Sequence, residues 1–305
     1  MNSIKKIFLT GASGCVGHYL IDEFLADEKY HLILLVRDSR KLRRDILESS
    51  KVTLVEAALE DFSKYAPFLK EVDFIIHVAT SWGGSFEVNY DLPLKIFEEA
   101  LGYKCQKVIH FSTASILDEK NQILAPGRQH GSEYIKSKLK LYEAVQNSPR
   151  RRQIITIFPT LVLGGDSRHP YSYISQALPV LKKWFWWLRF FKIDAGFHLI
   201  HAVDVAGLVK YFIENEMDQQ DYVLGYSYLT ADQLLKQLAE IFRKKIYFQI
   251  SLPVNFLIKL AQLFGATFLP WDLYCARHHR HFRYQVVGPA DFGLPRRFKD
   301  KDLFD

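Results

Sequence analysis

A tyrosine and a lysine four residues apart, Tyr134 and Lys138, are the side chains of this sequence best suited to proton transfer. Residues at this spacing share one face of a helix. A phenol with a pKa of about 10 is a poor base at neutral pH. A neighbouring ammonium favours the phenolate, as does a positively charged nicotinamide, and both bring the phenol into the range of acid–base catalysis. The pair therefore predicts a proton-transfer site on a helix.

Position along the chain, rather than spacing, selects this pair. Tyr103 and Lys107 have the same spacing, but they precede the apolar run 108–111, which we predict to be a strand. They would lie at the edge of the sheet remote from that strand's carboxyl end. Ligands in open α/β sheets bind at the carboxyl ends of the strands. The sequence therefore favours Tyr134 and Lys138.

A hydroxyl group follows the same predicted strand directly, at Thr113. There it can hydrogen-bond a substrate oxygen and hold it opposite the tyrosine. The alternative is that the small residues 112–115 only form a tight exit from the strand. Because Tyr134 and Lys138 follow on the next predicted helix, we expect Thr113, Tyr134 and Lys138 to form a catalytic site.

A glycine-rich loop near the N-terminus predicts a second site, for a phosphate group. It lies between an apolar run, 7–9, and a helical segment, 19–25. Glycines allow a tight turn, let the backbone approach a pyrophosphate and let the helix N-terminus face the anion. The residues that we expect to contact a dinucleotide here are Thr10, Gly11, Ser13, Gly14, Cys15, Val16 and Gly17.

The end of the second predicted strand bears on which dinucleotide binds. An acidic residue at this place in a dinucleotide-binding fold contacts the adenosine ribose. This chain has Arg37 there, with Arg40 and Lys41 just beyond. A guanidinium suits a 2′-phosphate, so the sequence favours NADP(H) over NAD(H). Two alternatives stay open: Asp38 reaches the ribose, or the cluster is a solvated surface.

These sites require a parallel sheet wrapped by helices. Strand-like and helix-like segments alternate along the sequence, as such a fold requires. We predict strands at 6–9, 32–36, 52–55, 74–77, 108–111, 154–158 and 222–224, and helices at 19–25, 92–100 and 132–146. The fold class is therefore α/β, a Rossmann-type doubly wound parallel sheet with a smaller, discontinuous C-terminal substrate lobe. We expect residues 1–165 and 198–225 to form the NAD(P)-binding domain, and residues 166–197 and 226–305 to form the lobe.

Composition narrows the class of protein. The chain has 305 residues, 49% of them hydrophobic, and a net charge of +6, which suits an anionic ligand but is no signature of nucleic-acid binding. Its three scattered cysteines predict neither disulfides nor a zinc site, and the basic run 277–281 favours an anion contact over a metal. No apolar run reaches the roughly 18–20 residues of a transmembrane segment. We expect a cytoplasmic location.

Further short motifs occur in the order in which one enzyme family has them. Residues 10–17 resemble a TGxxGxxG loop, 77–79 a cofactor contact after a strand, 158–164 an Rp-x-x-x-G segment, 201–206 an HVdDvA segment and 292–295 a closing LGxxP, with Asn89 also in place. The chain resembles an extended short-chain dehydrogenase/reductase, the family often labelled NAD-dependent epimerase/dehydratase. The resemblance implies that Val78, Ala79 and Pro159 contact the cofactor and that Lys138 also holds the nicotinamide ribose.

Several positions depart from that family's pattern. The family usually has an acidic residue contacting adenine after the third strand, but this chain reads Ala-Ala-Leu at 57–59, so we expect Leu59 there and an altered adenine contact. Ala114 replaces the acidic residue of sugar-nucleotide 4,6-dehydratases, Phe158 stands where sugar-nucleotide enzymes commonly have arginine, and Leu-Asp at 117–118 replaces Tyr-Gly. These changes weaken a sugar-nucleotide assignment and leave the catalytic triad intact.

The segment 182–192 is rich in aromatic and basic residues. At helical spacing its basic side chains gather on one arc, but Trp186 and Phe190 lie among them, so the segment is apolar almost all round. Packing in the core of the lobe is the favoured interpretation. A pocket for an apolar substrate and peripheral membrane contact through 182–192 are the alternatives.

Together these features predict an enzyme that transfers hydride between NADP(H) and a carbonyl or hydroxyl of a small-molecule substrate that the sequence does not identify, and an apolar substrate stays open. One alternative is a sugar-nucleotide epimerase or dehydratase with tightly bound cofactor. Another is a cofactor-binding regulatory or assembly protein without turnover. We expect a small-molecule substrate and no nucleic-acid partner, and a homodimer stays open.

Overall fold

A seven-stranded parallel sheet forms the centre of the molecule, with the strand order β3-β2-β1-β4-β5-β6-β11. The computed structural model describes residues 4–263, 265 and 267–299. The sheet strands are β1 (Lys5–Thr10), β2 (Tyr30–Val36), β3 (Val52–Glu56), β4 (Phe74–His77), β5 (Lys107–Phe111), β6 (Ile154–Pro159) and β11 (Asp221–Leu224). The α/β fold class and the predicted parallel sheet are confirmed.

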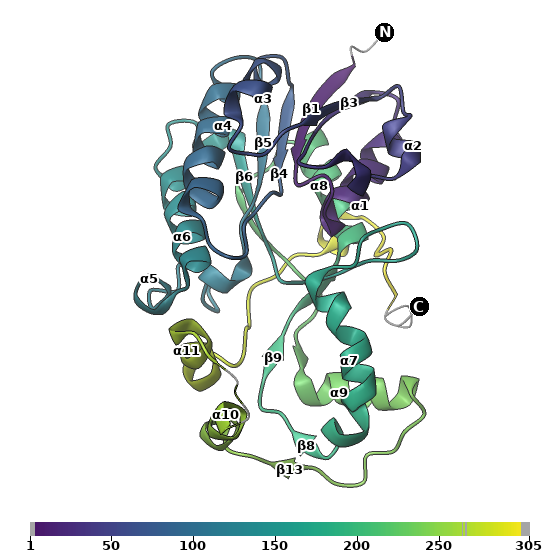
Figure 1. Ribbon diagram of the computed structural model, residues 1–305, viewed down its shortest axis with the longest axis vertical. Coiled ribbons are helices and arrows are strands. Elements are labelled where there is room, and N and C mark those ends of the chain that lie inside the picture. Colours follow the sequence, from purple (N-terminus) through teal and green to yellow (C-terminus); the bar gives the residue numbers. More distant parts are fainter. Residues whose placement is uncertain (1–3, 264, 266, 300–305) are drawn as a thin grey trace.

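Helices cover both faces of this sheet (Figure 1). The helices are α1 (Cys15–Leu25), α2 (Arg44–Leu47), α3 (Phe62–Leu69), α4 (Leu92–Leu101), α5 (Gly127–His130), α6 (Glu133–Gln146), α7 (Tyr173–Leu188), α8 (Ala202–Glu214), α9 (Ala231–Ile241), α10 (Val254–Leu263) and α11 (Pro270–His278). Helices α1 and α8 pack together on one face, and α3, α4 and α6 lie on the other.

Alternation along β1 shows why the strands read as continuous apolar runs. Ile7 and Leu9 belong to the core beneath α1 and α8, whereas Phe8 belongs to the core beneath α3 and α4. Successive side chains of a strand point to opposite faces, and both faces of a covered parallel sheet are buried. Each strand therefore needs apolar residues at nearly every position.

Helix α1 begins at Cys15, directly after the glycine-rich loop, and not near position 19 as the sequence predicted. The reason is a close approach of backbones. A Cβ atom on Gly17 would lie 2.3 Å from the carbonyl oxygen of Gly11 and 2.6 Å from that of Ala12. Only a glycine allows the first helical turn to lie against the turn that precedes it.

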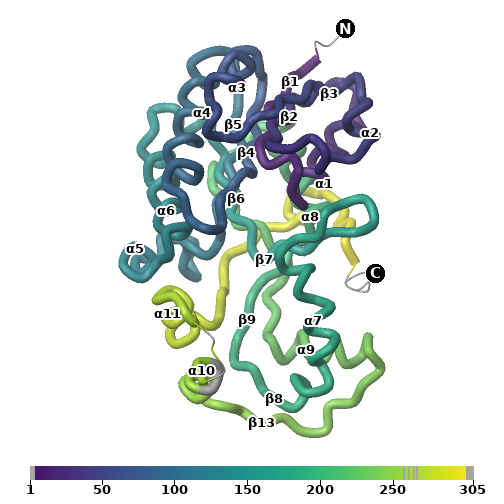
Figure 2. Tube along the Cα trace, in the orientation of Figure 1, coloured from purple at the N-terminus to yellow at the C-terminus, as the bar shows by residue number. Residues whose placement is uncertain are grey.

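Helices α7, α9, α10 and α11 and the short strands lie beyond the carboxyl edge of the sheet, as Figures 1 and 2 show. Small strand pairs connect them: β7 (Leu161–Leu163) with β10 (Leu199–His201), β9 (Gly196–Phe197) with β12 (Leu229–Thr230), and β8 (Phe191–Lys192) with β13 (Ile250–Ser251). The chain enters this lobe after β7, returns for α8 and β11, and enters it again. This path supports the predicted division into 1–165 with 198–225 and 166–197 with 226–305, which stays a prediction.

In the described part of the chain, no helix has both the length and the apolar character needed to cross a membrane.

We predict that Gly17→Ala destabilises the protein by about 1–3 kcal/mol, because the added methyl group meets backbone oxygens that cannot move aside. The gain in helix propensity, at most about 1 kcal/mol, does not offset this. Gly83→Ala is the matched control, since a Cβ there meets nothing within 4 Å. Urea denaturation of both variants measures the free energy of unfolding. Equal stabilities for the two variants would contradict the close approach.

Candidate active site

The glycine-rich loop fits the phosphate group that the sequence predicted. Gly14 precedes the first turn of α1 without a side-chain cap, and that turn has no acidic residue. The first N–H groups of a helix have no partner within the helix, and they carry its positive dipole end. Gly11 adopts a φ of +73°, and a Cβ there would lie 2.8 Å from the backbone nitrogen of Ala79. The loop is thus a compact cradle for an anion.

Thr10 joins the ends of two neighbouring strands, β1 and β4. Its hydroxyl accepts a hydrogen bond from the backbone N–H of Ala79 at 3.2 Å and lies 2.9 Å from Nδ1 of His77. Because the hydroxyl accepts from Ala79, its own hydrogen is free to donate to His77. Thr10 is fully buried. Its side chain therefore positions the loop and does not face a ligand.

The three predicted catalytic residues meet at the carboxyl end of β5. Thr113 caps the short helix η3 (Ala114–Ile116), and its Oγ1 accepts from the backbone N–H of Ser115 at 3.3 Å. Tyr134 lies in the first turn of α6, which Ser132 caps. The Thr113 hydroxyl lies beside the Tyr134 phenol, and its effect on the pKa of Tyr134 is to oppose the larger effect of burial. The two hydroxyl groups are therefore close enough to bind one substrate oxygen between them.

Burial nevertheless raises the pKa of Tyr134 to about 12, because the desolvation of the phenolate outweighs the effect of Thr113. The sequence had predicted that the Lys138 ammonium would lower this pKa. The Lys138 nitrogen lies 6.0 Å from the centre of the Tyr134 ring. The protein alone therefore keeps Tyr134 as a neutral phenol, a proton donor at neutral pH.

Lys138 is only 2% exposed, and its nitrogen donates to the carbonyl oxygen of Phe111 at 3.0 Å. Phe111 is the last residue of β5, two positions before Thr113. Lys138 thus ties α6 to the strand end that carries the catalytic threonine. Burial lowers the pKa of Lys138 to about 8, since the ammonium loses its hydration.

A row of buried polar side chains crosses the sheet beneath this lysine, and the sequence analysis did not find it. Thr10, His77, His110 and Thr156 are partners in the register of four neighbouring strands. Burial first, and then the charge of Lys138, lowers the pKa of His77 to about 3 and that of His110 well below its ordinary value. Both rings are therefore neutral beside the ammonium. The signal in the sequence that could have predicted this row was a polar residue near the end of each of four apolar strands.

Trp82 is the second residue that the sequence analysis missed. Its indole stacks on the Tyr134 ring, with ring centres 4.9 Å apart, and the ring of Tyr173 follows at 6.4 Å. Trp82 is 72% exposed and Tyr173 is 82% exposed. These rings form an open aromatic wall beside the catalytic tyrosine. Its sequence signal was weak, since Trp82 belongs to a loop and Tyr173 begins α7 in the other lobe.

Asn89 holds the loop that carries Trp82. It lies in the short helix η2 (Glu87–Asp91) and is fully buried. Its Oδ1 accepts from the backbone N–H of Ser81 at 2.8 Å and from the hydroxyl of Thr80 at 3.0 Å, and its Nδ2 donates to the Ser81 carbonyl at 2.9 Å. The asparagine therefore fixes the residue directly before the tryptophan.

At the end of β2, the acidic residue Asp38 forms an ion pair with Arg40. The carboxylate of Asp38 accepts from Nε of Arg40 at 2.9 Å and from its Nη2 at 3.1 Å. It also caps the short helix η1 (Ser39–Lys41). Arg37, directly after β2, is exposed, and no ion pair with it is seen among the described residues. The pairing therefore leaves the guanidinium of Arg37 open to a ligand.

Other predicted cofactor contacts lie along the same carboxyl edge, with different exposures. Half-buried positions follow β4, end β6, close the loop and begin α1. They are Val78, Ala79, Pro159, Ser13, Cys15 and Val16. The side chain of Leu59 is buried in the core, and its carbonyl accepts from the Tyr65 hydroxyl at 2.6 Å. Leu59 therefore offers no side chain to adenine.

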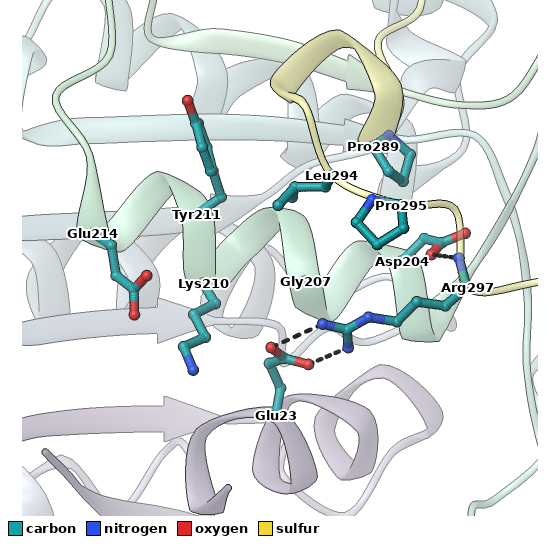
Figure 3. A pocket seen from close by; sticks show the side chains of 10 residues that line it. All are labelled: Glu23, Asp204, Gly207, Lys210, Tyr211, Glu214, Pro289, Leu294, Pro295 and Arg297. Carbon is teal, nitrogen blue, oxygen red and sulfur yellow. Dashed lines mark hydrogen bonds and ion pairs between the residues drawn. The ribbon is translucent and has the colours of Figure 1, made fainter. Parts of the chain in front are cut away.

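A separate pocket lies on the other face of the sheet, between α1, α8 and the C-terminal segment (Figure 3). Arg297 closes one side of it by an ion pair with Glu23 and by a backbone bond to Asp204 at 2.8 Å. Helix α6, which carries Tyr134 and Lys138, covers the opposite face. The pocket is therefore not the catalytic site.

The described residues contain no group of three or more histidine, cysteine, aspartate or glutamate side chains arranged to hold a metal ion.

The fold and this site define a dinucleotide-dependent enzyme, and comparison with known proteins agrees. The model of the NAD dependent epimerase/dehydratase family matches residues 7–225. The chain belongs to this family, as the sequence motifs predicted.

Individual relatives are distant. Over 133 residues the chain is 29% identical to an uncharacterized UDP-glucose epimerase, YtcB, of Bacillus subtilis (strain 168), a match that spans 38% of this chain and 42% of that protein. A dTDP-glucose 4,6-dehydratase from Bacillus anthracis str. Ames in complex with NAD has a TM-score of 0.70 at 14% identity, covering 97% of this chain and 93% of that one. Vestitone reductase from alfalfa has a TM-score of 0.69 at 17% identity, covering 98% and 96%. At these identities the two solved structures share the fold.

We predict that Lys138→Met changes how stability depends on pH. The folded pKa of Lys138, about 8, lies below its ordinary 10.5, so between these values the unfolded chain binds more protons. Wild-type stability therefore rises with pH relative to the variant, by ~3 kcal/mol at most. Urea denaturation from about pH 7 to about pH 10 measures the difference.

Lys136→Met is the matched control for this prediction, because Lys136 lies on the same helix with its side chain exposed. We expect its stability to follow that of the wild type at every pH. Parallel curves for Lys138→Met and the wild type would contradict the buried ammonium.

Proposed function

We propose that the protein is an NADP(H)-dependent oxidoreductase that transfers hydride to or from a carbonyl or hydroxyl carbon of an apolar substrate. The observation that carries this proposal is the aromatic wall at the catalytic tyrosine, where Trp82 stacks on Tyr134 and Tyr173 follows. Exposed aromatic rings next to a proton donor favour an apolar molecule whose reacting oxygen is its polar end.

The residues of the chain supply the proton transfer. Thr113 holds the substrate oxygen, and the neutral phenol of Tyr134 donates a proton to that oxygen when a carbonyl is reduced. In the opposite direction, the proton of the alcohol passes to the same oxygen, which must then be a phenolate. Lys138 fixes the strand end that carries Thr113 and places a positive charge near the phenol. When bound in the glycine cradle, NADP(H) supplies the hydride chemistry.

The preference for NADP(H) rests on the charges after β2. The carboxylate of Asp38 accepts from Arg40, and this pairing competes with the ribose hydroxyls that an acidic residue binds in NAD(H)-selective sites. Exposed Arg37 is suited to bidentate bonding of a 2′-phosphate.

Sugar-nucleotide epimerase chemistry is the second candidate. The likeness to YtcB, described as a UDP-glucose epimerase, favours it. Ala114 and Phe158 speak against it. Ala114 is buried in the place of the dehydratase acid, and Phe158 is buried against Tyr142, with ring centres 5.0 Å apart. Ala114 thus speaks against dehydration, and Phe158 leaves no arginine at a position where sugar-nucleotide enzymes commonly have one.

We predict that Arg37→Ala weakens NADPH binding by about 10- to 100-fold and leaves NADH binding unchanged, because one charge-assisted interaction with the 2′-phosphate is lost. Isothermal titration calorimetry measures both dissociation constants. Arg44→Ala is the control, since Arg44 is an exposed arginine of the same domain, paired with Glu48 on α2. An equal loss for both dinucleotides, or no loss for either, would speak against the preference.

We predict that the wild-type protein consumes NADPH with members of a panel of apolar aldehydes and ketones, and that Tyr134→Phe lowers kcat by about 100- to 10,000-fold. The dissociation constant for NADPH stays unchanged, because the phenol acts on the substrate oxygen. Tyr103→Phe is the matched control, since it precedes a lysine at the same spacing outside the site.

Each other outcome points to a different function. Tightly bound cofactor without net consumption, together with interconversion of UDP-sugars, identifies the epimerase. Absence of turnover on either class of substrate, with a cellular phenotype that survives Tyr134→Phe but not Gly17→Ala, identifies a protein that binds the cofactor without catalysis.

A further inference from the structure

The end of the lobe farthest from the sheet carries exposed aromatic rings and basic residues that the proposed reaction does not use. We call this surface the lobe tip and define it as residues 180–193 and 242–251. Its charged residues are all basic: Lys182, Lys183, Arg189, Lys192, Arg243, Lys244 and Lys245. Trp184, Trp186 and Trp187 are 53%, 53% and 62% exposed. The predicted core packing of this segment is therefore wrong for its tryptophans.

The two segments of the lobe tip form one surface, as Figure 2 shows at β8 and β13. These strands pair through Phe191 with Ile250 and Lys192 with Ser251. The buried guanidinium of Arg189 donates to the carbonyl of Lys245 at 2.9 Å. Tight contacts between the segments mean that their exposed side chains are presented together.

Helix α7 has a core face and an outer face. Phe185 is buried against Leu235 and Leu238 of α9, in a small separate core. Beside the core face lies a shallow apolar groove, lined by Ala177, Val180, Leu181, Trp184 and Leu188. Leu181 and Leu188 also pack against the small core, whereas Val180 and Trp184 are exposed. Helix α7 thus packs one side against the small core and leaves other apolar side chains exposed.

Acidic residues border the lobe tip. Asp194 pairs with Arg280 and His281. Asp232 accepts from the backbone N–H of Ile193 at 3.3 Å, and Glu240, near the end of α9, is exposed. The basic residues of the tip outnumber these carboxylates, so the tip presents a net positive charge around its exposed indoles. Lys244 illustrates the mixture, with its nitrogen 5.8 Å from the Trp186 ring.

We propose that the lobe tip docks on the surface of an anionic phospholipid bilayer. Indole rings favour the boundary between acyl chains and headgroups, and lysine side chains reach from apolar surface to phosphate. Basic residues near an anionic surface each strengthen binding about fivefold. A protein partner fits less well, because lysine is depleted in protein–protein interfaces. The charge and the aromatic content together match the amphipathic helices that lie in a membrane interface.

This docking is independent of the reaction that the site catalyses. It has one consequence for an apolar substrate, however. The outer stripe of α7 begins at Tyr173, which stacks on Trp82 beside Tyr134. A docked lobe therefore places an exposed apolar stripe between the bilayer and the catalytic tyrosine.

Flotation of the full-length protein with vesicles tests the proposal. We expect binding to vesicles of phosphatidylcholine mixed with phosphatidylglycerol, little binding to phosphatidylcholine alone, and release at high salt. Tryptophan emission should shift to the blue on binding, and brominated lipids should quench it. Lys182→Glu with Lys183→Glu should weaken binding about 25-fold or more. Trp184→Ser with Trp187→Ser should also weaken it and abolish most of the emission shift.

Matched controls lie on the sheet domain. Tyr103→Ser removes an aromatic ring of similar exposure, and Lys64→Glu reverses an exposed charge on α3. Both should bind vesicles like the wild type. Circular dichroism and NADPH binding verify that the lobe-tip variants are folded.

Wild-type protein that does not float with anionic vesicles would overturn the proposal. So would vesicle binding that the lobe-tip variants retain in full. Self-association that Trp184→Ser with Trp187→Ser abolishes, without vesicle binding by the wild type, would assign the surface to a second copy of this chain and also overturn it.

Discussion

The buried ammonium of Lys138 is the constraint on which the catalytic end of this molecule depends. It is removed from water, and its hydrogen bond to the Phe111 carbonyl at the end of β5 offsets this only in part, because burial still lowers its pKa to about 8. That bond joins α6, which carries Tyr134, to the strand end that carries Thr113. The neutral histidines of the polar row add no competing charge beside it. The geometry of the site thus depends on one side chain, whereas the pKa of Tyr134 is set mainly by burial.

A second connection holds the cofactor end of the sheet. The Thr10 hydroxyl links β1 to the exit of β4, and the glycines allow the loop between β1 and α1 to pass against that exit. From the same exit the chain continues to Trp82, whose position Asn89 fixes. The phosphate cradle and the aromatic wall are therefore built on one stretch of backbone.

The lobe follows different physical rules from the sheet. Its small core needs only one side of α7, because Phe185 and the residues of α9 fill it. The other side keeps apolar surface exposed from Tyr173 to Trp187, surrounded by lysines and arginines. Exposed apolar surface of this extent is costly in water unless a ligand or another surface covers it. Our proposals for an apolar substrate and for a bilayer surface both derive from this one property.

The sequence by itself determined the fold, and it singled out the glycine-rich loop and the set of Thr113, Tyr134 and Lys138 that we propose to be catalytic. Each of these features reflects a local constraint. Buried parallel strands are continuous apolar runs, and glycine spacing reflects the close approach of backbones. Tyr134 and Lys138 share a helix face because they are four residues apart. Tertiary structure alone decided the direction of the Tyr134 pKa, the stacking of Trp82 and the exposure of the α7 tryptophans. The early start of α1 also followed from packing, since Gly17 lies against Gly11. Burial depends on which distant segments meet, and residue order along one segment does not specify that.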